Sequence, residues 1–478
     1  MSPAPKDMSK FFNPESVAIV GVPRTDYRFG GLSYLNRFQD SGFPGRLYPI
    51  NPKADEINGL KAYPSLTALP EAPDLAIVCV AARIVPAILE ECGRLGLRHI
   101  HILSSGFGEV GTPEGRALED RLAEVAREHD LLVIGPNCMG PYSPSARLTA
   151  WGAIPGMPGP LGIISQSGGI TQRLTEYAWR LGLGVDKAVS FGNGAVLSAS
   201  DFLEYMAEDD RIRAICMYLE SVPDGPAFLR LAARVNRDKP IILFKGGLSE
   251  AGASTAASHT GGLAGRVGLW SAFFAQTGVT QVTSMDEWLD AALAFCFLPP
   301  PAGKGVFVVG GGGGNSVAYA DTFVREGLAV PRLSEKTMAW LKETVPAAGN
   351  IAGNPLDMWQ TFMDPAYLIE TLERGYQDPA VGMIVVDRLI PRMAFHMPDL
   401  PDPNPAVVEH LKKNGRPKPT AFMVDSEGGD PELAAAGASL RALYGGAGVP
   451  AFPSAARAAR AMGHLYRYYA RFGRNRTE

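Results

Sequence analysis

The sequence has little excess charge of either sign. Its 45 lysine and arginine residues and 49 aspartate and glutamate residues give a formal net charge of −4. Proteins that grip the phosphate backbone of nucleic acids need a basic field, so we expect no nucleic-acid partner. Hydrophobic residues make up 46% of the 478 residues and charged residues 20%, a balance that excludes a largely disordered chain.

Long apolar runs and paired cysteines are also missing. The longest uncharged apolar stretch, residues 75–82, ends at Arg83, well short of the roughly 18 to 20 residues that a membrane helix needs. Residues 1–14 hold no apolar core of signal-peptide length. None of the five cysteines belongs to a Cys-x-x-Cys pair, which indicates reduced thiols. We therefore expect a cytoplasmic protein with no membrane span.

Glycine (54 residues) and proline (39 residues) are abundant and follow no Gly-X-Y period, which indicates many turns. Short apolar runs alternate with segments of helical period, the pattern of parallel strands covered by crossover helices. We predict an α/β protein with doubly wound parallel sheets in three blocks. The predicted strands are 17–22, 74–80, 99–103 and 131–135; then 161–164, 214–219 and 240–244; then 305–309, 383–386 and 420–424.

Two segments rich in proline and glycine, 152–159 and 299–303, separate these blocks. Another segment, 391–405, is rich in proline, methionine and aspartate and is too long and irregular for an ordinary connection. A lid, an interface loop and a mobile excursion are all compatible with its composition.

The first predicted strand runs into Gly21-Val22-Pro23, with Gly30-Gly31 further on. The dinucleotide fingerprint Gly-x-Gly-x-x-Gly is therefore absent where an NAD-binding Rossmann enzyme would have it. From these residues alone, a structural turn and a ligand-binding loop are equal alternatives.

Two later strands run into small-residue turns that open helices, at 165–169 and 310–316. Free N–H groups at a helix start bind anions, and glycine lets a phosphate approach. At the first turn, capping of the helix by Ser167 is the slightly favoured alternative. At the second, five successive glycines cost too much chain entropy for a mere turn, which favours phosphate binding. The candidate phosphate-binding residues are Ser167, Gly168, Gly169, Gly313, Gly314 and Asn315.

One histidine stands out because its neighbours are all small. His259 lies in the run 251–265, among serine, threonine, alanine and glycine, and so has little apolar material to pack against. We predict a presented nucleophile that carries a transferred group. Glu220, at the end of the strand 214–219, is a candidate to orient its ring, with a surface glutamate as the alternative. Lys245 ends the next strand and is either a phosphate-neutralising or a solvated lysine.

Two other candidate sites are less convincing. His99 and His101 share one strand face, but no third ligand lies nearby in the sequence, so we expect no metal. Cys138 has no evident base and is better suited to line a pocket than to attack a substrate.

In combination, the motifs of the chain resemble the α subunit of ADP-forming (NDP-forming) acyl-CoA synthetases, relatives of succinyl-CoA synthetase. The motifs are Asn51-Pro52-Lys53, Ser104-Ser105-Gly106-Phe107, Gly135-Pro136-Asn137-Cys138, Ser165-Gln166-Ser167-Gly168-Gly169, Ser258-His259-Thr260-Gly261 and Gly353-Asn354-Pro355-Leu356-Asp357. The resemblance covers nearly the whole chain. It implies a CoA-binding Rossmann-like domain over 1–150, then two flavodoxin-like ligase domains over 158–298 and 303–478.

The resemblance also implies roles for residues. His259 would carry phosphate, Glu220 would steady the phosphohistidine, and the two glycine-headed helices would hold the phosphate. CoA would be bound at Gly21, Val22, Pro23, Asn51, Lys53, Val80, Ser105, Gly106, Asn137 and Cys138. The implied reaction is acyl-CoA + ADP + phosphate ⇌ carboxylate + CoA + ATP, through an acyl phosphate.

Two departures from the family pattern are present. The chain has Val80-Ala81 in place of a Val-Pro pair, and it has Gly194-Ala195-Val196-Leu197-Ser198 in place of an acidic segment. The second departure is expected to affect the acyl pocket or a partner contact. Nothing in the sequence looks like the ATP-grasp domain that binds ATP or ADP with Mg²⁺ in such enzymes. The resemblance therefore implies a separate β chain, in an α2β2 assembly. An NAD-dependent oxidoreductase and a non-catalytic CoA or acyl-CoA sensor are the alternatives.

Overall fold

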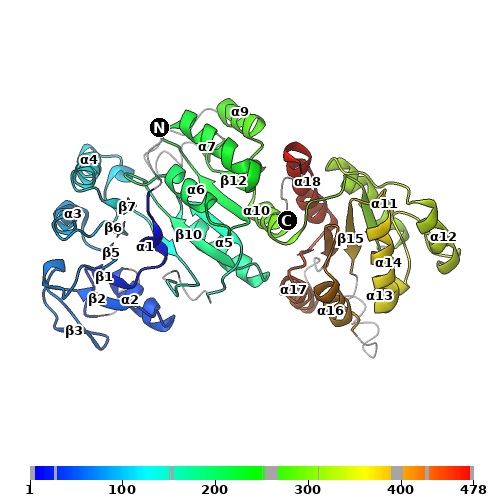
Figure 1. Cartoon of the computed structure of the whole chain (residues 1–478), viewed down its shortest axis with the longest axis horizontal. Coiled ribbons are helices and arrows are strands. Elements are labelled where there is room, and N and C mark those ends of the chain that lie inside the picture. The colour runs from blue at the N-terminus through cyan, green and yellow to red at the C-terminus, as the bar shows by residue number, and fades with distance from the viewer. Residues whose placement is uncertain are drawn as a thin grey trace. The chain divides into compact units, whose positions relative to one another are not determined.

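The computed structural model describes residues 6–25, 30–149, 151, 156–249, 251–252, 267–310, 312–388, 402–425 and 430–473. The chain forms two compact units, Met1–Trp179 with Gly184–Thr283 and Arg180–Leu183 with Ser284–Glu478 (Figure 1). The three-domain division derived from the sequence stays a prediction. Of the segment 391–405, residues 391–401 lie outside the described residues.

The first unit contains two sheets. In the first, all strands are parallel in the order β2-β1-β5-β6-β7: β1 (Ser16–Val20), β2 (Arg46–Ile50), β5 (Leu75–Val78), β6 (His99–Ile102) and β7 (Leu132–Ile134). The helices α2 (Gly31–Asp40), α3 (Val85–Arg94) and α4 (Pro113–Glu128) connect them. A small antiparallel pair, β3 (Glu56–Ile57) and β4 (Leu60–Lys61), follows β2. The strands are almost fully buried, as the continuous apolar runs predict.

The second sheet has the order β13-β12-β11-β9-β10-β8, with only β8 antiparallel. Its strands are β8 (Gly140–Tyr142), β9 (Leu161–Ser165), β10 (Val185–Ser190), β11 (Ala214–Leu219), β12 (Ile241–Lys245) and β13 (Thr280–Val282). The helices of this part are α5 (Gly168–Arg180), α6 (Ala199–Ala207), α7 (Gly225–Asp238) and α9 (Val267–Thr277). Because β8 directly follows the loop after β7, the two sheets of this unit are joined by residues 135–140.

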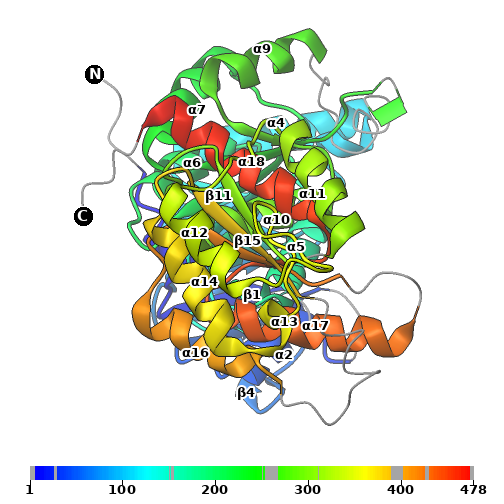
Figure 2. The same cartoon turned by 90° about the vertical axis from the view of Figure 1, so that its right-hand side faces the viewer.

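The second unit is built on the parallel sheet β14-β15-β16-β17: β14 (Val306–Val309), β15 (Met383–Asp387), β16 (Thr420–Met423) and β17 (Ala451–Phe452). One core joins alternate strand residues to α12 (Glu335–Thr344), α14 (Pro365–Gln377), α16 (Asn404–Asn414) and α17 (Pro431–Gly445). In both views α12 and α14 lie next to each other (Figures 1 and 2), where Trp340 stacks on Tyr367. The remaining helices include α10 (Met285–Phe297), α11 (Gly313–Arg325), α13 (Gln360–Met363) and α18 (Ala455–Phe472).

The helix α10 is fixed by a local cap and by an ion pair with a residue distant in the sequence. Ser284 caps α10 by accepting a hydrogen bond from the Glu287 N–H at 3.1 Å, as the Ser-x-x-Glu spacing predicts. The helix then pairs with α18 through Asp290 and Arg457, whose carboxylate and guanidinium are 2.6 Å apart.

Within the described part of the chain, no helix is long and apolar enough to cross a membrane.

These sheets confirm the predicted α/β class with parallel strands. The short strands β3, β4, β8, β13 and β17 were not predicted, nor were the longer β2 and β10, for which there is a physical reason. Strand β2 includes Pro49, which weakens the strand signal. Strand β10 includes Asp186 and Lys187, charged residues that are rarely buried unless paired.

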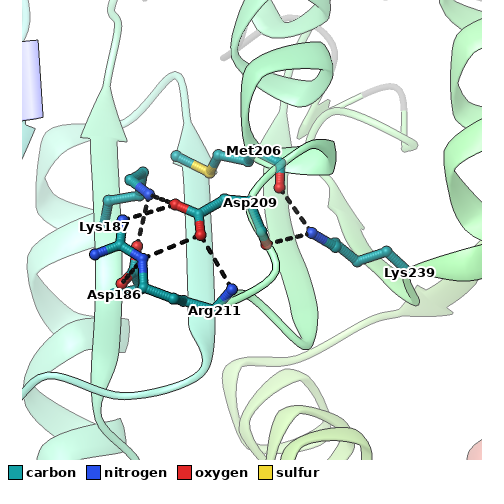
Figure 3. Close-up of polar contacts among 6 residues, drawn as sticks. All are labelled: Asp186, Lys187, Met206, Asp209, Arg211 and Lys239. Carbon is teal, nitrogen blue, oxygen red and sulfur yellow. Dashed lines mark hydrogen bonds and ion pairs between the residues drawn. The ribbon is translucent and has the colours of Figure 1, made fainter. Parts of the chain in front are cut away.

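The charges of β10 are paired in a network at one end of the second sheet (Figure 3). Lys187 is 2% exposed, and its ammonium donates to Asp186 at 2.6 Å and to Asp209. The Arg211 guanidinium also donates to Asp209, at 2.8 and 3.1 Å. Lys239 donates to the carbonyls of Met206 (3.0 Å) and Asp209 (2.7 Å). The network therefore ties β10 to the segment between α6 and β11.

The network makes a prediction about stability and pH. Hydrogen bonds from Arg211, together with Lys187, hold the pKa of Asp209 well below its ordinary value. Folding lowers this pKa, so the stabilisation is complete above about pH 4 and is lost as the pH falls below it. We expect Asp209→Asn to lower the free energy of unfolding by about 3 kcal/mol at pH 7, because a buried charge loses one partner.

Urea unfolding of both proteins at pH 7 and pH 3 measures this effect. The difference between wild type and Asp209→Asn should shrink at pH 3, whereas the exposed neighbour variant Asp210→Asn should stay near wild type at both. An Asp209→Asn difference that is equal at both pH values would contradict the assignment.

Candidate functional site

The candidate catalytic carboxylate, Glu220, lies at the edge of the second sheet where the parallel strands end. It directly follows β11, and its side chain is buried, with the residue 6% exposed. The Tyr218 hydroxyl donates to Glu220 Oε1 at 3.2 Å. The surface-glutamate alternative is therefore wrong, because this carboxylate lies inside the protein.

A glutamine fixes the main chain around Glu220. Gln166 directly follows β9, the strand beside β11. Its side-chain oxygen accepts hydrogen bonds from the N–H groups of Glu220 (2.5 Å) and Ser221 (3.0 Å). The sequence analysis gave Gln166 no role of its own, although its place at a strand end was a usable signal.

Lys245 lies next to this carboxylate. It ends β12, in register with Leu219 of β11, and is 3% exposed. Its ammonium donates to the Glu220 carbonyl at 2.8 Å and to the Gly246 carbonyl, and lies 5.1 Å from the Trp270 ring centroid. Burial lowers the pKa of Lys245 to about 8. The solvated-lysine alternative is therefore wrong as well.

A pocket of about 540 Å³ opens directly after Glu220, and the sequence analysis did not predict it. It lies between the first turn of α7 and the face of α9. Eight of its ten lining residues are glycine or apolar, and the two polar ones are Ser221 and Arg230. Phe228 and Phe273 stack inside it with ring centroids 5.5 Å apart. An apolar pocket therefore lies beside the Glu220 edge of the sheet.

The glycine-headed helix α5 begins at the same edge. Ser167 Oγ accepts a hydrogen bond from the Ile170 N–H at 3.4 Å, so Ser167 caps the helix as the simpler alternative predicts. At Gly168 an added Cβ would lie 2.7 Å from Met139 Cγ, so a larger residue there would have to displace the Met139 side chain. At Gly169 an added Cβ would meet nothing within 4 Å, so the space in front of the helix is open. Capping and anion binding by the remaining N–H groups are compatible.

The second glycine-rich turn, at the head of α11, belongs to the other compact unit. Gly310 and Gly312 have φ of +88° and +72°, which explains glycine at these two positions. Gly314 needs no such explanation, since an added Cβ would meet nothing within 4 Å. At Gly313 the nearest atom to an added Cβ is Asp357 Oδ2, at 3.9 Å, and burial raises the pKa of Asp357. Gly313 and Gly314 are exposed, and phosphate binding at this helix start stays a prediction.

The predicted CoA-binding residues gather at the corresponding edge of the first sheet. Gly21 has φ of +90°, and an added Cβ would lie 2.5 Å from the Cys79 carbonyl. The Asn51 amide donates to the Val22 carbonyl at 2.7 Å and accepts from the Lys53 N–H at 2.8 Å. Pro23 and Val80 are half-buried, whereas Lys53 is exposed.

The loops after β5, β6 and β7 meet through Ser104. Its hydroxyl donates to the Val80 carbonyl, and its own carbonyl accepts from the Asn137 N–H at 2.9 Å. Ser105 is exposed beside it, and Gly106 has φ of +108°. Cys138 is buried, which raises the pKa of its thiol far above neutral, so the reactive thiolate is not formed.

Three other predicted features have simple outcomes. His259 lies outside the described residues, with all of 253–266. His101 is buried against the Cys138 carbonyl, and within the described part of the chain no three metal-ligating side chains come together.

In the unusual segment 194–198, the N–H groups of Ala195 and Leu197 donate to the carbonyls of Gly135 and Val133, at 3.1 and 3.2 Å. That segment joins the two sheets of the first unit.

The geometry predicts an electrostatic link between Glu220 and Lys245. The Glu220 charge raises the pKa of Lys245 against the lowering effect of burial. Glu220→Gln should therefore lower the Lys245 pKa further below about 8, as followed by the ¹³Cε signal of labelled lysine during a pH titration. The exposed-site variant Glu208→Gln should leave the midpoint in place. An unchanged or higher midpoint in Glu220→Gln would show that the two groups are not coupled.

Comparison with known proteins identifies the chain. Residues 15–143 match the model of a CoA binding domain, and residues 158–295 that of a succinyl-CoA ligase like flavodoxin domain. The chain is 34% identical to the α subunit of acetate–CoA ligase (ADP-forming) I from Pyrococcus furiosus, covering 96% of this chain and 97% of that one. It is 30% identical to 4-hydroxybutyrate–CoA ligase (ADP-forming) from Nitrosopumilus maritimus, covering 79% and 54%.

A solved structure agrees with these matches. Acetyl-coenzyme A synthetase 1 of Ca. Korarchaeum cryptofilum, described as dinucleotide forming and solved with phosphate and ADP, superposes with a TM-score of 0.85. It is 31% identical, and the match covers 98% of this chain and 97% of that one. The chain therefore belongs to the family of α subunits of ADP-forming acyl-CoA synthetases, which are acid–CoA ligases, and it has that family's CoA-binding and succinyl-CoA ligase-like domains.

Proposed function

We propose that this α subunit interconverts acyl-CoA, ADP and phosphate with a carboxylate, CoA and ATP, through an acyl phosphate and a phosphohistidine at His259. The observation that carries the proposal is the buried Glu220, held by Gln166 at the strand edge where α5 begins. A carboxylate at this place is near the open start of α5. It can accept a hydrogen bond from an imidazole and stabilise the cationic or phosphorylated ring.

The reaction divides into three transfers. A phosphate oxygen attacks the thioester carbonyl, and the CoA thiolate leaves, giving an acyl phosphate. A nitrogen of His259 then attacks the phosphorus, and the carboxylate leaves. An oxygen of the ADP β-phosphate finally takes the phosphoryl group and frees the imidazole.

The residues of the chain serve these steps by position and charge. N–H groups at Gly168 and Gly169, and in the other unit at Gly313, Gly314 and Asn315, would bind phosphoryl oxygens. The Lys245 ammonium, which is held by two main-chain carbonyls, is a further hydrogen-bond donor close to Glu220. The carrier is needed because the pocket that suits a thioester cannot also suit a nucleotide, and each transfer requires a dry, oriented site.

CoA would bind at the carboxyl edge of the first sheet. Its adenine and pyrophosphate would approach the backbone at Gly21, Val22 and Pro23, near Asn51 and Lys53. Its pantetheine arm would pass Val80, Ser105 and Gly106 and end near Asn137 and Cys138. The lack of a dinucleotide fingerprint argues against NAD at this loop.

The nucleotide would be bound by a partner. Family members of this kind are named as α subunits, which implies a β chain. We propose that this β chain carries the ATP-grasp domain with ATP or ADP and Mg²⁺, in an α2β2 assembly in the cytoplasm. The five cysteines of this chain, all within the described residues, form no disulfide, which suits a reducing compartment.

The CoA proposal is tested by calorimetry on the full chain without a partner. CoA should bind and NAD should not, since the Gly21 loop lacks the Gly-x-Gly-x-x-Gly spacing. Lys53→Glu should weaken CoA by about tenfold, because it replaces a cation near a phosphate with an anion. The exposed-site variant Lys61→Glu serves as the control. Tight NAD binding without CoA binding would favour the oxidoreductase alternative.

The phosphohistidine proposal is tested by labelling with an acyl-CoA and ³²P-phosphate. The chain should acquire an acid-labile, alkali-stable label, and His259→Ala should abolish it. Glu220→Gln should keep CoA binding but lower labelling by about a hundredfold, because only the charge that supports the ring is lost. Wild-type labelling in His259→Ala would refute the covalent step, and loss of CoA binding in Glu220→Gln would indicate a folding defect.

A further inference from the structure

The loop formed by residues 135–140, called the Cys138 loop below, has an unusual backbone. Gly135, Asn137 and Gly140 all have positive φ, at +106°, +59° and +75°. Glycine adopts positive φ readily, whereas Asn137 does so at a steric cost that the surrounding contacts offset. The contacts that hold this loop therefore bear on what the loop does.

Donors from four separate parts of the first unit hold the carbonyls of the loop. Main-chain N–H groups of Ala195 and Asn193 donate to the carbonyls of Gly135 and Pro136, both at 3.1 Å. The Tyr34 hydroxyl and the Trp151 indole donate to the Met139 carbonyl, at 2.8 and 3.0 Å. Ring N–H and O–H groups inside a protein need such acceptors.

The fourth part of the first unit that holds the loop is β6, through its residue His101. Its Nε2 lies 3.1 Å from the Cys138 carbonyl, which can only accept, so Nε2 carries the proton. The ring is fully buried, and burial lowers the pKa of His101 to about 4, so it stays neutral. The fit is tight, because an added Cβ at Gly140 would lie 2.4 Å from the His101 ring. No metal or catalytic role uses this histidine.

The loop also touches the head of α5. An added Cβ at Gly168 would lie 2.7 Å from Met139 Cγ, so Met139 packs directly on that helix start. In the proposed function, phosphate at this helix start attacks the thioester. The part of CoA that reaches the Cys138 loop is then the thiol end, while the nucleotide end stays near Gly21 and Asn51.

We propose that His101 and Tyr34 are positioning residues that hold the Cys138 loop in the shape that receives the thiol end of CoA. The proposal rests on the proposed function. It assigns a task to two buried side chains that do not touch the reacting atoms. Its consequence is selective, since loosening this loop should affect the pantetheine arm and leave the nucleotide end of CoA in place.

The test compares two ligands by calorimetry on the full chain: CoA, and adenosine 3′,5′-bisphosphate, which lacks the pantetheine arm. His101→Leu should weaken CoA by about tenfold, as expected when a buried acceptor loses its donor, and leave the bisphosphate within about twofold. His101→Gln, which can place a side-chain N–H near the same carbonyl, should recover most of the CoA affinity. His99→Gln, on the same strand but bonded to the Asp7 carbonyl, is the matched control.

Tyr34→Phe keeps the test decisive if His101→Leu does not fold. It removes one hydroxyl and should weaken CoA by about threefold, because Trp151 still donates to Met139. Unchanged CoA affinity in the folded variants, or an equal loss for both ligands, would overturn the proposal. Failure of the wild-type chain to bind CoA would overturn the proposed function with it, and the two outcomes are distinct.

Discussion

In each of the two larger sheets of the first unit, one side-chain amide ties together the loops at the strand ends where candidate site residues lie. Asn51 bridges the loops after β1 and β2, and Gln166 those after β9 and β11. In the third sheet, Asn354 accepts from the Val308 N–H and donates to the carbonyls of Val306 and Pro331, at 2.8 to 3.0 Å. Parallel strands that are buried on both faces can present polar groups only at their ends. A loop at such an end keeps its shape only if its main-chain groups are hydrogen-bonded.

This constraint explains why the informative motifs are short and scattered. Asn51, Gln166 and Asn354 each belong to a motif on which the family resemblance depends. In each motif the amide holds main-chain groups of neighbouring segments in place. At α5, for example, Gln166 holds the loop of Glu220, while Gly169 leaves open space. Structural and functional residues are therefore adjacent in the sequence because they are needed at the same strand end.

The sequence was sufficient for the class of fold and for placing Glu220 and Lys245 at the ends of neighbouring strands. Strand 214–219 was predicted with the bounds that the structure has, because β11 is a continuous apolar run. Strand β10 was missed because the burial of Lys187 depends on Asp209, which lies 22 residues away and is brought close only by the fold. The burial of Glu220, the pocket beside it and the clamp on the Cys138 loop were beyond reach for the same reason. Each depends on residues that are distant in the sequence and meet only at a sheet edge.

The central claim is that the phosphoryl group travels on His259 between a thioester site and a nucleotide site. The most direct test isolates the phosphorylated chain, mixes it with ADP, Mg²⁺ and the β partner, and follows ATP by rapid quench. The account predicts one ATP per phosphorylated chain, formed at least as fast as the steady-state turnover. Transfer slower than turnover, or no ATP at all, would contradict it.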